Sequence, residues 1–282
     1  MSVTRVPLSC EFFPTATPEG AEKLAAVRRD LAVFQFEYFS VTYGAGGSTR
    51  DRTMNLVARM CAENGPPVMP HLTCVASTEA EIRTLLDDYQ ALGINRLMAL
   101  RGDMPSGAFE NAGFTTATQL VSYVRQLWGE NARICVAAYP EVHPRARTPA
   151  EDLHAFREKV MAGATDAVTQ YFYNADAYLR FRDEVAARGV DITITPGIMP
   201  ITNYSQLARF SDSCGAEIPR WLRKRLESLQ DQPEALLDFG ADVIAQLCQR
   251  LIAEGVPALH FYSMNRADVI LSIADRLGWR RG

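Results

Sequence analysis

The sequence predicts a single (β/α)8 barrel, or TIM barrel, spanning residues 1–282, with extra helices between its seventh and eighth strands. Strand-like runs alternate with helix-like segments along the chain, which is typical of βαβ units and a parallel sheet. The runs are apolar on both faces, as strands covered by helices should be. Several runs end in polar side chains, and a barrel gathers its active-site residues at that end of its strands. The length also fits, because such barrels take about 250 residues.

Eight apolar runs are candidates for the barrel strands. Each is short, and each is followed by a loop before the next helical pattern begins. The predicted strands are Leu8 to Phe12, Phe36 to Val41, Val68 to Leu72, Arg96 to Leu100, Arg133 to Ala138, Ala167 to Gln170, Asp191 to Thr195 and Ala258 to Tyr262.

Capping signals mark several of the helices between these strands. A hydroxyl or amide residue before a proline or an acidic residue indicates a helix start, and a glycine indicates its end. The predicted starts are Thr17-Pro18-Glu19, Ser77-Thr78-Glu79, Thr148-Pro149 and Asn174 or Ala175, and the last three helices should end near Gly93, Gly163 and Gly189. The loop from Met104 to Phe114 either covers a ligand or is a solvated turn, and residues 196–257 have room for two or three helices.

The bulk composition argues against several classes of protein. A net charge of −4 does not favour nucleic acid or an anionic membrane surface as a partner. No apolar run reaches the length of about 18 residues that a membrane span needs, and the N-terminus lacks a signal-peptide pattern. The six cysteines show neither a C-x-x-C pair nor zinc spacing. We therefore expect a cytoplasmic protein without a metal.

Several familiar catalytic motifs are missing from the chain. The segment Gly44-Ala45-Gly46-Gly47 fails the dinucleotide pattern G-x-G-x-x-G because Thr49 occupies the position of the last glycine. No lysine ends a predicted strand, which argues against a Schiff-base aldolase. Neither H-E-x-x-H nor G-x-S-x-G occurs.

Two carboxyl groups at strand ends are the leading candidates for catalysis. Glu11 is flanked by Cys10 and Phe12, and apolar surroundings raise the pKa of a carboxyl, which suits a general acid. The alternative is that Glu11 caps a backbone group or pairs with an arginine. Asp103 follows Arg101 and Gly102, where the glycine permits close approach of a ligand; a plain ion pair between Arg101 and Asp103 is the alternative.

The four histidines divide by their position in the predicted barrel. His71 and His143 lie at strand ends, where a structural role and a functional role are equally open. His260 lies inside the last strand, which favours a core histidine with a hydrogen-bond partner. His154 lies on a predicted helix and is expected at the surface.

The strand-end segments resemble those of bacterial methylenetetrahydrofolate reductases, in order and over the whole length. The matching segments are EFFP at Glu11, SVTYGAGGSTRDRT from Ser40, PHLTC from Pro70, ALRGD from Ala99, VAAYPEVHP from Val136, TQYFY from Thr169, PGIMPITN from Pro196 and HFYSMNRA from His260. The combination of EFFP, RGD and YPEVHP in these places is specific to that family.

The resemblance implies an FAD-dependent barrel that reduces 5,10-methylenetetrahydrofolate to 5-methyltetrahydrofolate, which serves methionine synthesis. NADH or NADPH would reduce the flavin first, and the folate would then use the same flavin face, giving ping-pong kinetics. Glu11 would be the general acid at the folate nitrogen N10, and Asp103 would lie near the flavin and the folate. The family is often a homo-oligomer, so one is possible here.

The resemblance also assigns the remaining binding residues. FAD would be held by Thr42, His71, Leu100, Arg101, Gly102, Asp103, Ala137, Tyr139, His143, Asp152 and Lys159. The folate and nicotinamide side would be lined by Glu11, Asp103, Gln170, Phe210, Tyr262 and Arg266. From its position alone, Lys159 is predicted to be a solvated helix lysine.

One position departs from the family pattern, and two rival functions stay open. A tyrosine of the loop after RGD contacts the flavin in relatives, and Phe114 is the nearest equivalent here. The rivals are a (β/α)8 lyase without flavin and a catalytically silent paralogue that binds folate or flavin. The missing strand-end lysine argues against the first, and the joint presence of Glu11, Asp103 and Gln170 argues against the second.

Overall fold

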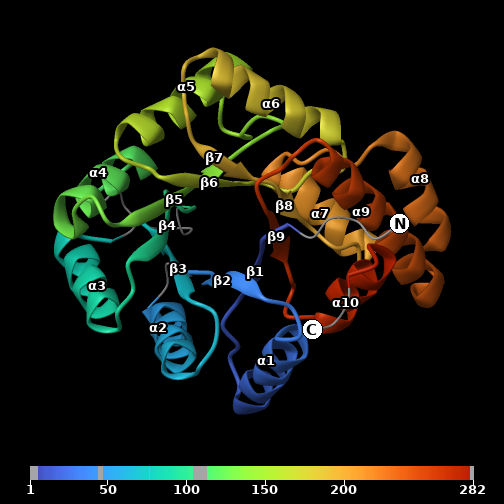
Figure 1. Cartoon of the computed structure of the whole chain (residues 1–282), viewed down its shortest axis with the longest axis horizontal. Coiled ribbons are helices and arrows are strands. Elements are labelled where there is room, and N and C mark those ends of the chain that lie inside the picture. Colours follow the sequence, from blue (N-terminus) through green and yellow to red (C-terminus); the bar gives the residue numbers. More distant parts are fainter. Residues whose placement is uncertain (1–5, 44–46, 76, 104–112, 280–282) are drawn as a thin grey trace.

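A ring of parallel strands forms the centre of the molecule, and helices surround it (Figure 1). The computed structural model describes residues 6–43, 47–75, 77–103 and 113–279. Within them, nine strands follow the order β7-β6-β5-β4-β3-β2-β1-β9-β8, and every neighbouring pair is parallel. The strands are β1 (Leu8–Phe12), β2 (Phe36–Val41), β3 (Val68–Thr73), β4 (Arg96–Leu100), β5 (Arg133–Ala138), β6 (Asp166–Thr169), β7 (Thr193–Thr195), β8 (Gly197–Ile198) and β9 (Leu259–Tyr262). The predicted fold class is confirmed.

The two ends of this strand order meet at Pro196, which separates β7 from β8. β7 pairs with β6, and β8 pairs with β9, so one bent segment joins both sides of the barrel. Proline has no N–H to donate to a ladder, and its carbonyl here accepts from the His260 N–H at 3.1 Å. The predicted seventh strand, Asp191 to Thr195, ends where β7 ends but begins two residues too early, and the prediction missed β8, so the expected eight strands become nine.

The other strand predictions are close to the observed bounds. β6 begins and ends one residue before the predicted run, β9 begins at Leu259, and β3 extends to Thr73. Gln170 thus lies just beyond β6, although its N–H still donates to the Ala138 carbonyl at 2.7 Å.

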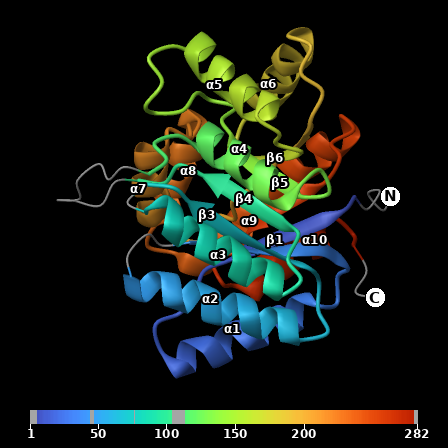
Figure 2. The ribbon, with the colours of Figure 1, turned by 90° about the vertical axis from the view of Figure 1, so that its left-hand side faces the viewer.

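The helices form the outer layer, as the side view in Figure 2 shows. Thr17, Thr78, Thr148 and Asn174 are N-caps whose side chains accept from the first helical turn, as their sequence signals predict. The helices are α1 (Pro18–Leu31), α2 (Gly47–Ala62), α3 (Glu79–Ala91), α4 (Ala117–Trp128), α5 (Pro149–Met161), α6 (Ala175–Ala187), α7 (Tyr204–Cys214), α8 (Arg220–Leu229), α9 (Pro233–Ala253) and α10 (Ala267–Arg276). None of the helices described is long and apolar enough to cross a membrane.

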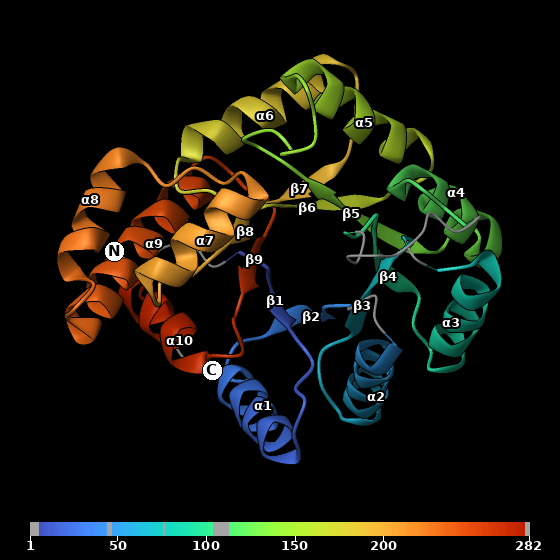
Figure 3. The ribbon, with the colours of Figure 1, turned by 180° about the vertical axis from the view of Figure 1, so that it is seen from behind.

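Three helices, α7, α8 and α9, fill the long connection between β8 and β9, which confirms the predicted insertion. In Figure 2 the β4 arrow points toward the end of the barrel at which α7 lies. Figure 3, the view from behind, shows α7 in front of β8 and β9. The insertion therefore covers part of the carboxy-terminal end of the barrel. Most of the predicted long loop, residues 104–112, lies outside the described residues.

The interior of the barrel is filled by a small cluster of side chains from adjacent strands. Tyr38, Met69, Met98, Cys135 and Val168 come from β2, β3, β4, β5 and β6 in turn, and all are buried. They form a group separate from the larger apolar cluster that packs the sheet against the helices. Side chains therefore fill the inside of the barrel, and any binding site must lie at one of its two ends.

Candidate active site

A cleft of about 250 Å³ lies at the carboxy-terminal ends of β4 and β5, against α4 and α5. These strand ends bring together eight of the eleven residues that the sequence assigned to the cofactor. The lining residues are Ala99, Leu100, Arg101, Gly102, Asp103, Ala117, Ala137, Tyr139, His143, Arg145 and Lys159. Three of them are cationic, so the cleft suits a ligand that carries phosphate.

Glu11 and His71 form a largely buried pair at the same end of the barrel, on β1 and β3. Glu11 Oε2 lies 3.5 Å from His71 Nε2, which is long for a hydrogen bond. Burial raises the pKa of Glu11 to about 8 and lowers the pKa of His71 to about 4. Near pH 7 the proton therefore resides on the Glu11 carboxyl, and the pair is neutral rather than ionic. This is the protonation state that a general acid requires.

Tyr262, at the end of β9, reaches across the mouth of the barrel toward β6. Its hydroxyl donates to the Thr169 carbonyl at 2.7 Å, and burial raises its pKa far above the ordinary value. Gly197 faces the ring, and a Cβ there would come within 2.6 Å of it. Glycine is therefore required at this position for Tyr262 to lie where it does.

The Arg101-Gly102-Asp103 segment turns sharply where β4 ends. Gly102 has a φ of +82°, and a Cβ there would lie 2.7 Å from the Thr73 Cβ. Arg101 donates to the carbonyls of Thr115 and Gly102, at 3.1 and 3.2 Å. No ion pair joins the described side chains of Arg101 and Asp103, so the alternative of a plain ion pair is wrong. Asp103 is exposed at the cleft.

The turn after β5 is held by Asp152 from α5. The Asp152 carboxylate accepts from the His143 N–H at 2.9 Å, and His143 Nδ1 accepts from the Arg145 N–H at 3.0 Å. The Tyr139 and His143 rings pack edge to face, with their centroids 4.4 Å apart. Asp152 therefore shapes the cleft through His143 and is not itself among the residues that line it.

Lys159, on α5, points into the cleft and not into solvent. Its Nζ donates to the Ala137 carbonyl at the end of β5, and burial lowers its pKa to about 8. The prediction from position alone, a solvated lysine, was wrong, because α5 packs along β5 and carries this side chain to the carboxy-terminal rim. An ammonium group in this place is available to a phosphate.

The other predicted binding residues lie around the rim without lining the cleft. Thr42 follows β2, and its carbonyl accepts from the Thr53 hydroxyl at 3.1 Å. Phe210, on α7, is 40% exposed. Arg266 pairs with Asp268 in the first turn of α10. The Phe114 ring packs on Tyr123 at a centroid distance of 4.9 Å.

The remaining histidines behave as their positions predicted. His260 is fully buried in β9, and its Nδ1 lies 2.7 Å from the Ser9 hydroxyl, so it is a core histidine with a partner. His154 is exposed on α5. In the described part of the chain, no group of three or more His, Cys, Asp or Glu side chains could hold a metal ion.

Sequence reasoning missed three residues of this region. Arg145 lines the cleft and follows YPEVHP directly, so its charge next to a strand-end motif was an available signal. Ser263 and Asn265 bond to the backbone around Glu11. No local pattern could have revealed that contact, because about 250 residues separate the partners.

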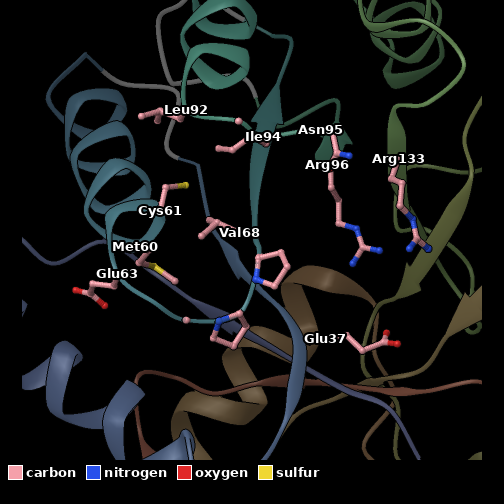
Figure 4. Close-up of a pocket in the computed structure, with 14 residues that line it drawn as sticks. Glu37, Met60, Cys61, Glu63, Val68, Leu92, Ile94, Asn95, Arg96 and Arg133 are labelled. Atoms are coloured by element: carbon pink, nitrogen blue, oxygen red, sulfur yellow. The ribbon is translucent and has the colours of Figure 1, made fainter.

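A larger cavity lies at the opposite end of the barrel. Its volume is about 560 Å³, and it is lined by the first residues of several strands, among them Val68, Arg96 and Arg133. Figure 4 shows Arg96, Arg133 and Glu37 on one side of this cavity. Barrel enzymes carry their chemistry at the carboxy-terminal end, so we assign the site to the smaller cleft.

The residues at the mouth fit a flavin dinucleotide. Arg101, Arg145 and Lys159 supply positive charge for a pyrophosphate, and Tyr139 supplies an aromatic surface. His71 Nε2 and Thr73 Oγ1 are buried without a hydrogen-bond partner at the same end of the barrel. Buried polar atoms without partners are uncommon, and a ligand at the mouth would satisfy them.

A parallel barrel with a protonated carboxyl and a cationic cleft at its carboxy-terminal mouth belongs to the class of (β/α)8-barrel enzymes. The sequence model of the family described as "Methylenetetrahydrofolate reductase" matches residues 2–278. The 5,10-methylenetetrahydrofolate reductase of Escherichia coli is 38% identical over 278 residues, which are 99% of this chain and 93% of the relative. An Arabidopsis thaliana protein named methylenetetrahydrofolate reductase (NADH) 1 is 36% identical over 96% of this chain and 48% of its own length. The chain belongs to the methylenetetrahydrofolate reductase family.

Solved structures share the fold at lower identity. One is titled as an uncharacterized protein from Clostridium thermocellum that binds two copies of 5-methyl-5,6,7,8-tetrahydrofolic acid. It has a TM-score of 0.69 and 16% identity, covering 97% of this chain and 94% of that one. An oxaloacetate acetylhydrolase aligns with a TM-score of 0.51 and 10% identity over 96% of this chain and 79% of its own. At these identities the likeness shows the barrel alone.

Proposed function

We propose that this enzyme reduces 5,10-methylenetetrahydrofolate to 5-methyltetrahydrofolate, with electrons that NADH or NADPH passes to bound FAD in a ping-pong sequence. Family membership makes it a methylenetetrahydrofolate reductase, an oxidoreductase acting on folate. The cofactor, the electron donor and the residue roles are the proposed part. A possible homo-oligomer, a cytoplasmic location and a role in methionine synthesis belong to the same proposal.

The place of Glu11 carries the mechanism: its carboxyl lies at the end of β1, is 19% exposed and lies 3.5 Å from His71 Nε2, where burial raises its pKa. Opening the methylene bridge requires a proton on the leaving nitrogen N10 of the folate, and it leaves an iminium on N5. A carboxyl with a pKa of about 8 holds that proton at neutral pH and can release it to a nitrogen within reach. His71 is neutral, so it does not draw the proton away as an ion-pair partner would.

FAD would occupy the cleft at β4 and β5 and supply the hydride. Arg101 and Lys159 would pair with its pyrophosphate, and the turn held by Asp152 would shape its binding surface. The Asp103 carboxylate would lie near the flavin ring, where a negative charge disfavours anionic reduced flavin and so favours hydride donation. Gln170, Phe210, Tyr262 and Arg266 would contact the folate or the nicotinamide.

The test is the Glu11→Gln variant, assayed in two half-reactions. Purified wild type should be yellow, and NADH or NADPH should bleach its flavin absorption. We expect Glu11→Gln to keep that bleaching and to lose folate-driven reoxidation by about 100-fold or more, in the range that general acid catalysis contributes. Equal losses in both half-reactions would show that Glu11 is not the acid.

The rival functions have distinct outcomes in the same experiment. A lyase without flavin would be colourless, and family membership already argues against it. A silent paralogue would be yellow, or would bind folate, without turnover. Steady-state rates with NADH and with NADPH then identify the electron donor.

A further inference from the structure

The backbone just beyond Glu11 is held by a side chain from the other end of the chain. The paired register of β1 and β9 ends at Glu11 and Tyr262. Phe13 lies past that point, where its peptide groups would lack a strand partner. Asn265 takes the strand's place: its Oδ1 accepts from the Phe13 N–H at 3.1 Å, and its Nδ2 donates to the Phe13 carbonyl at 2.9 Å. A side-chain amide can do this because it carries one acceptor and one donor group side by side.

The turn that carries Asn265 has a costly backbone conformation. Met264 and Asn265 have φ values of 52° and 53°, and the Arg266 N–H donates to the Ser263 carbonyl at 2.9 Å. Positive φ at both central residues defines a type I′ turn, in which glycine and asparagine are usual and methionine is rare. Such strain persists only where the surroundings hold it, and it is concentrated at functional sites.

Ser263 completes the connection between this turn and β1. Its hydroxyl donates to the Glu11 carbonyl and accepts from the Asn265 N–H at 3.0 Å. On the other side, the Phe12 carbonyl accepts from the Thr42 N–H at 2.9 Å. The segment from Glu11 to Phe13 is therefore held from two sides: Glu11 and Phe13 bond to the turn after β9, and Phe12 bonds to Thr42 after β2.

We infer that Asn265 is a positioning residue, which fixes the Glu11 carboxyl at the barrel mouth by binding both peptide groups of Phe13. The inference rests on the proposed role of Glu11 as the acid. Asn265 itself does not have to touch the folate, because it acts through the backbone. Proton transfer requires the carboxyl within hydrogen-bond reach of its acceptor, and a displacement of about 1 Å costs on the order of 100-fold in rate.

The matched variant is Asn265→Gly. Glycine adopts a positive φ without strain, so the turn is kept while both bonds to Phe13 are lost. We expect kcat/KM for folate reduction to fall roughly 10- to 100-fold. The alkaline limb of its pH profile should move below pH 8, because a displaced carboxyl is better solvated. In a Glu11→Gln background, the same change should cost less than about twofold, since residues that act as a unit are not additive.

Two companion variants separate positioning from a general loss of structure. Asn174→Gly makes the same exchange at the N-cap of α6, where Asn174 accepts from the Asp176 N–H at 3.0 Å, and it should leave folate reduction unchanged. Asn265→Asp tolerates positive φ but sets an oxygen against the Phe13 carbonyl, and it should be at least as impaired as Asn265→Gly. Thermal unfolding midpoints report whether each variant folds.

The outcomes distinguish this inference from the proposed function. If Glu11→Gln keeps folate reduction, the role of Glu11 itself is wrong. If Glu11→Gln is inactive but Asn265→Gly matches the wild type, the positioning role is overturned. It is also overturned if Asn265→Gly costs the same factor in both backgrounds, because that pattern describes a structural effect unrelated to the acid.

Discussion

The pH dependence of stability tests the protonation of Glu11 without any substrate. The Glu11 side chain is 19% exposed, and burial raises its pKa from 4.5 to about 8. A carboxyl with a raised folded-state pKa contributes stability that is present in full below the unfolded pKa of 4.5. That contribution is lost as the pH rises through 8. The wild type should therefore lose stability with rising pH relative to Glu11→Gln, which cannot titrate at this position.

The size of this loss follows from the two pKa values. At about 1.4 kcal/mol per pH unit, the wild type should lose about 4 kcal/mol relative to Glu11→Gln between pH 5 and pH 8.5. About 2 kcal/mol of this falls above pH 6.5, where His71 is neutral in the folded state and its titration in the unfolded state is the same for both proteins. These figures are upper values, because the partly exposed carboxyl retains some hydration.

The assay is urea-induced unfolding of both proteins in the same cofactor state, at half-unit steps from pH 5 to pH 8.5. The glutamine also changes the contact with His71, but that change adds a nearly constant offset above pH 6.5. The diagnostic quantity is thus the slope of the stability difference against pH. Parallel curves for the two proteins would mean that the folded carboxyl titrates near its ordinary value, and the assignment of Glu11 as a neutral-pH acid would lose its physical basis.

Three further changes probe the cleft and the outer layer. Gly102→Ala adds a Cβ that clashes at a φ of +82°, so it should lower the free energy of unfolding in urea by about 2–4 kcal/mol and cause loss of bound FAD. Gly129→Ala is the control: its φ is +71° but its Cβ meets open space, so it should cost only about 1 kcal/mol. Lys159→Met should weaken FAD retention by about tenfold, measured as flavin released on dilution; unchanged retention would remove Lys159 from the cofactor site. Arg276→Ala removes the ion pairs of α10 with Asp238 and Asp242 of α9. Because salt screens exposed charges, the variant should lower the unfolding midpoint by less in high salt than in low salt. An equal loss at both salt concentrations would show that Arg276 stabilises the protein without its charge.

The fold was predictable because its signals are local. Strand runs such as Leu8 to Phe12 carry their own apolar pattern, and caps such as Thr78 carry their own hydrogen-bonding chemistry. The break at Pro196 was harder to predict. A proline after a strand run does not indicate whether the chain leaves the sheet or bends and pairs again, as β8 does with β9. That choice depends on β9, some 60 residues later in the chain.

The site was predictable only in part, for a similar reason. Glu11, Arg101 and Tyr139 lie at or just beyond the ends of strand runs, so the barrel rule places them at one mouth. Lys159 lies on a helix, and the helical pattern does not indicate which end of the barrel its side chain reaches. The contact of its Nζ with the Ala137 carbonyl of β5 becomes apparent only in the folded structure. Asn265 contacts a backbone segment 252 residues away, and nothing in its own neighbourhood encodes that partner.

The place of β9 has a consequence for biosynthesis. β9 is the only strand described that joins β1 to β8, so the ring stays open until the ribosome has delivered residues 259–262. Until then a nascent chain presents the bare edges of β1 and β8, which are exposed to wrong pairing. Closure of the barrel needs β9, and the contacts of Ser263 and Asn265 near Glu11 need the residues directly after it. A chain that ended before residue 259 would have neither a closed barrel nor the contacts of Asn265 that position Glu11.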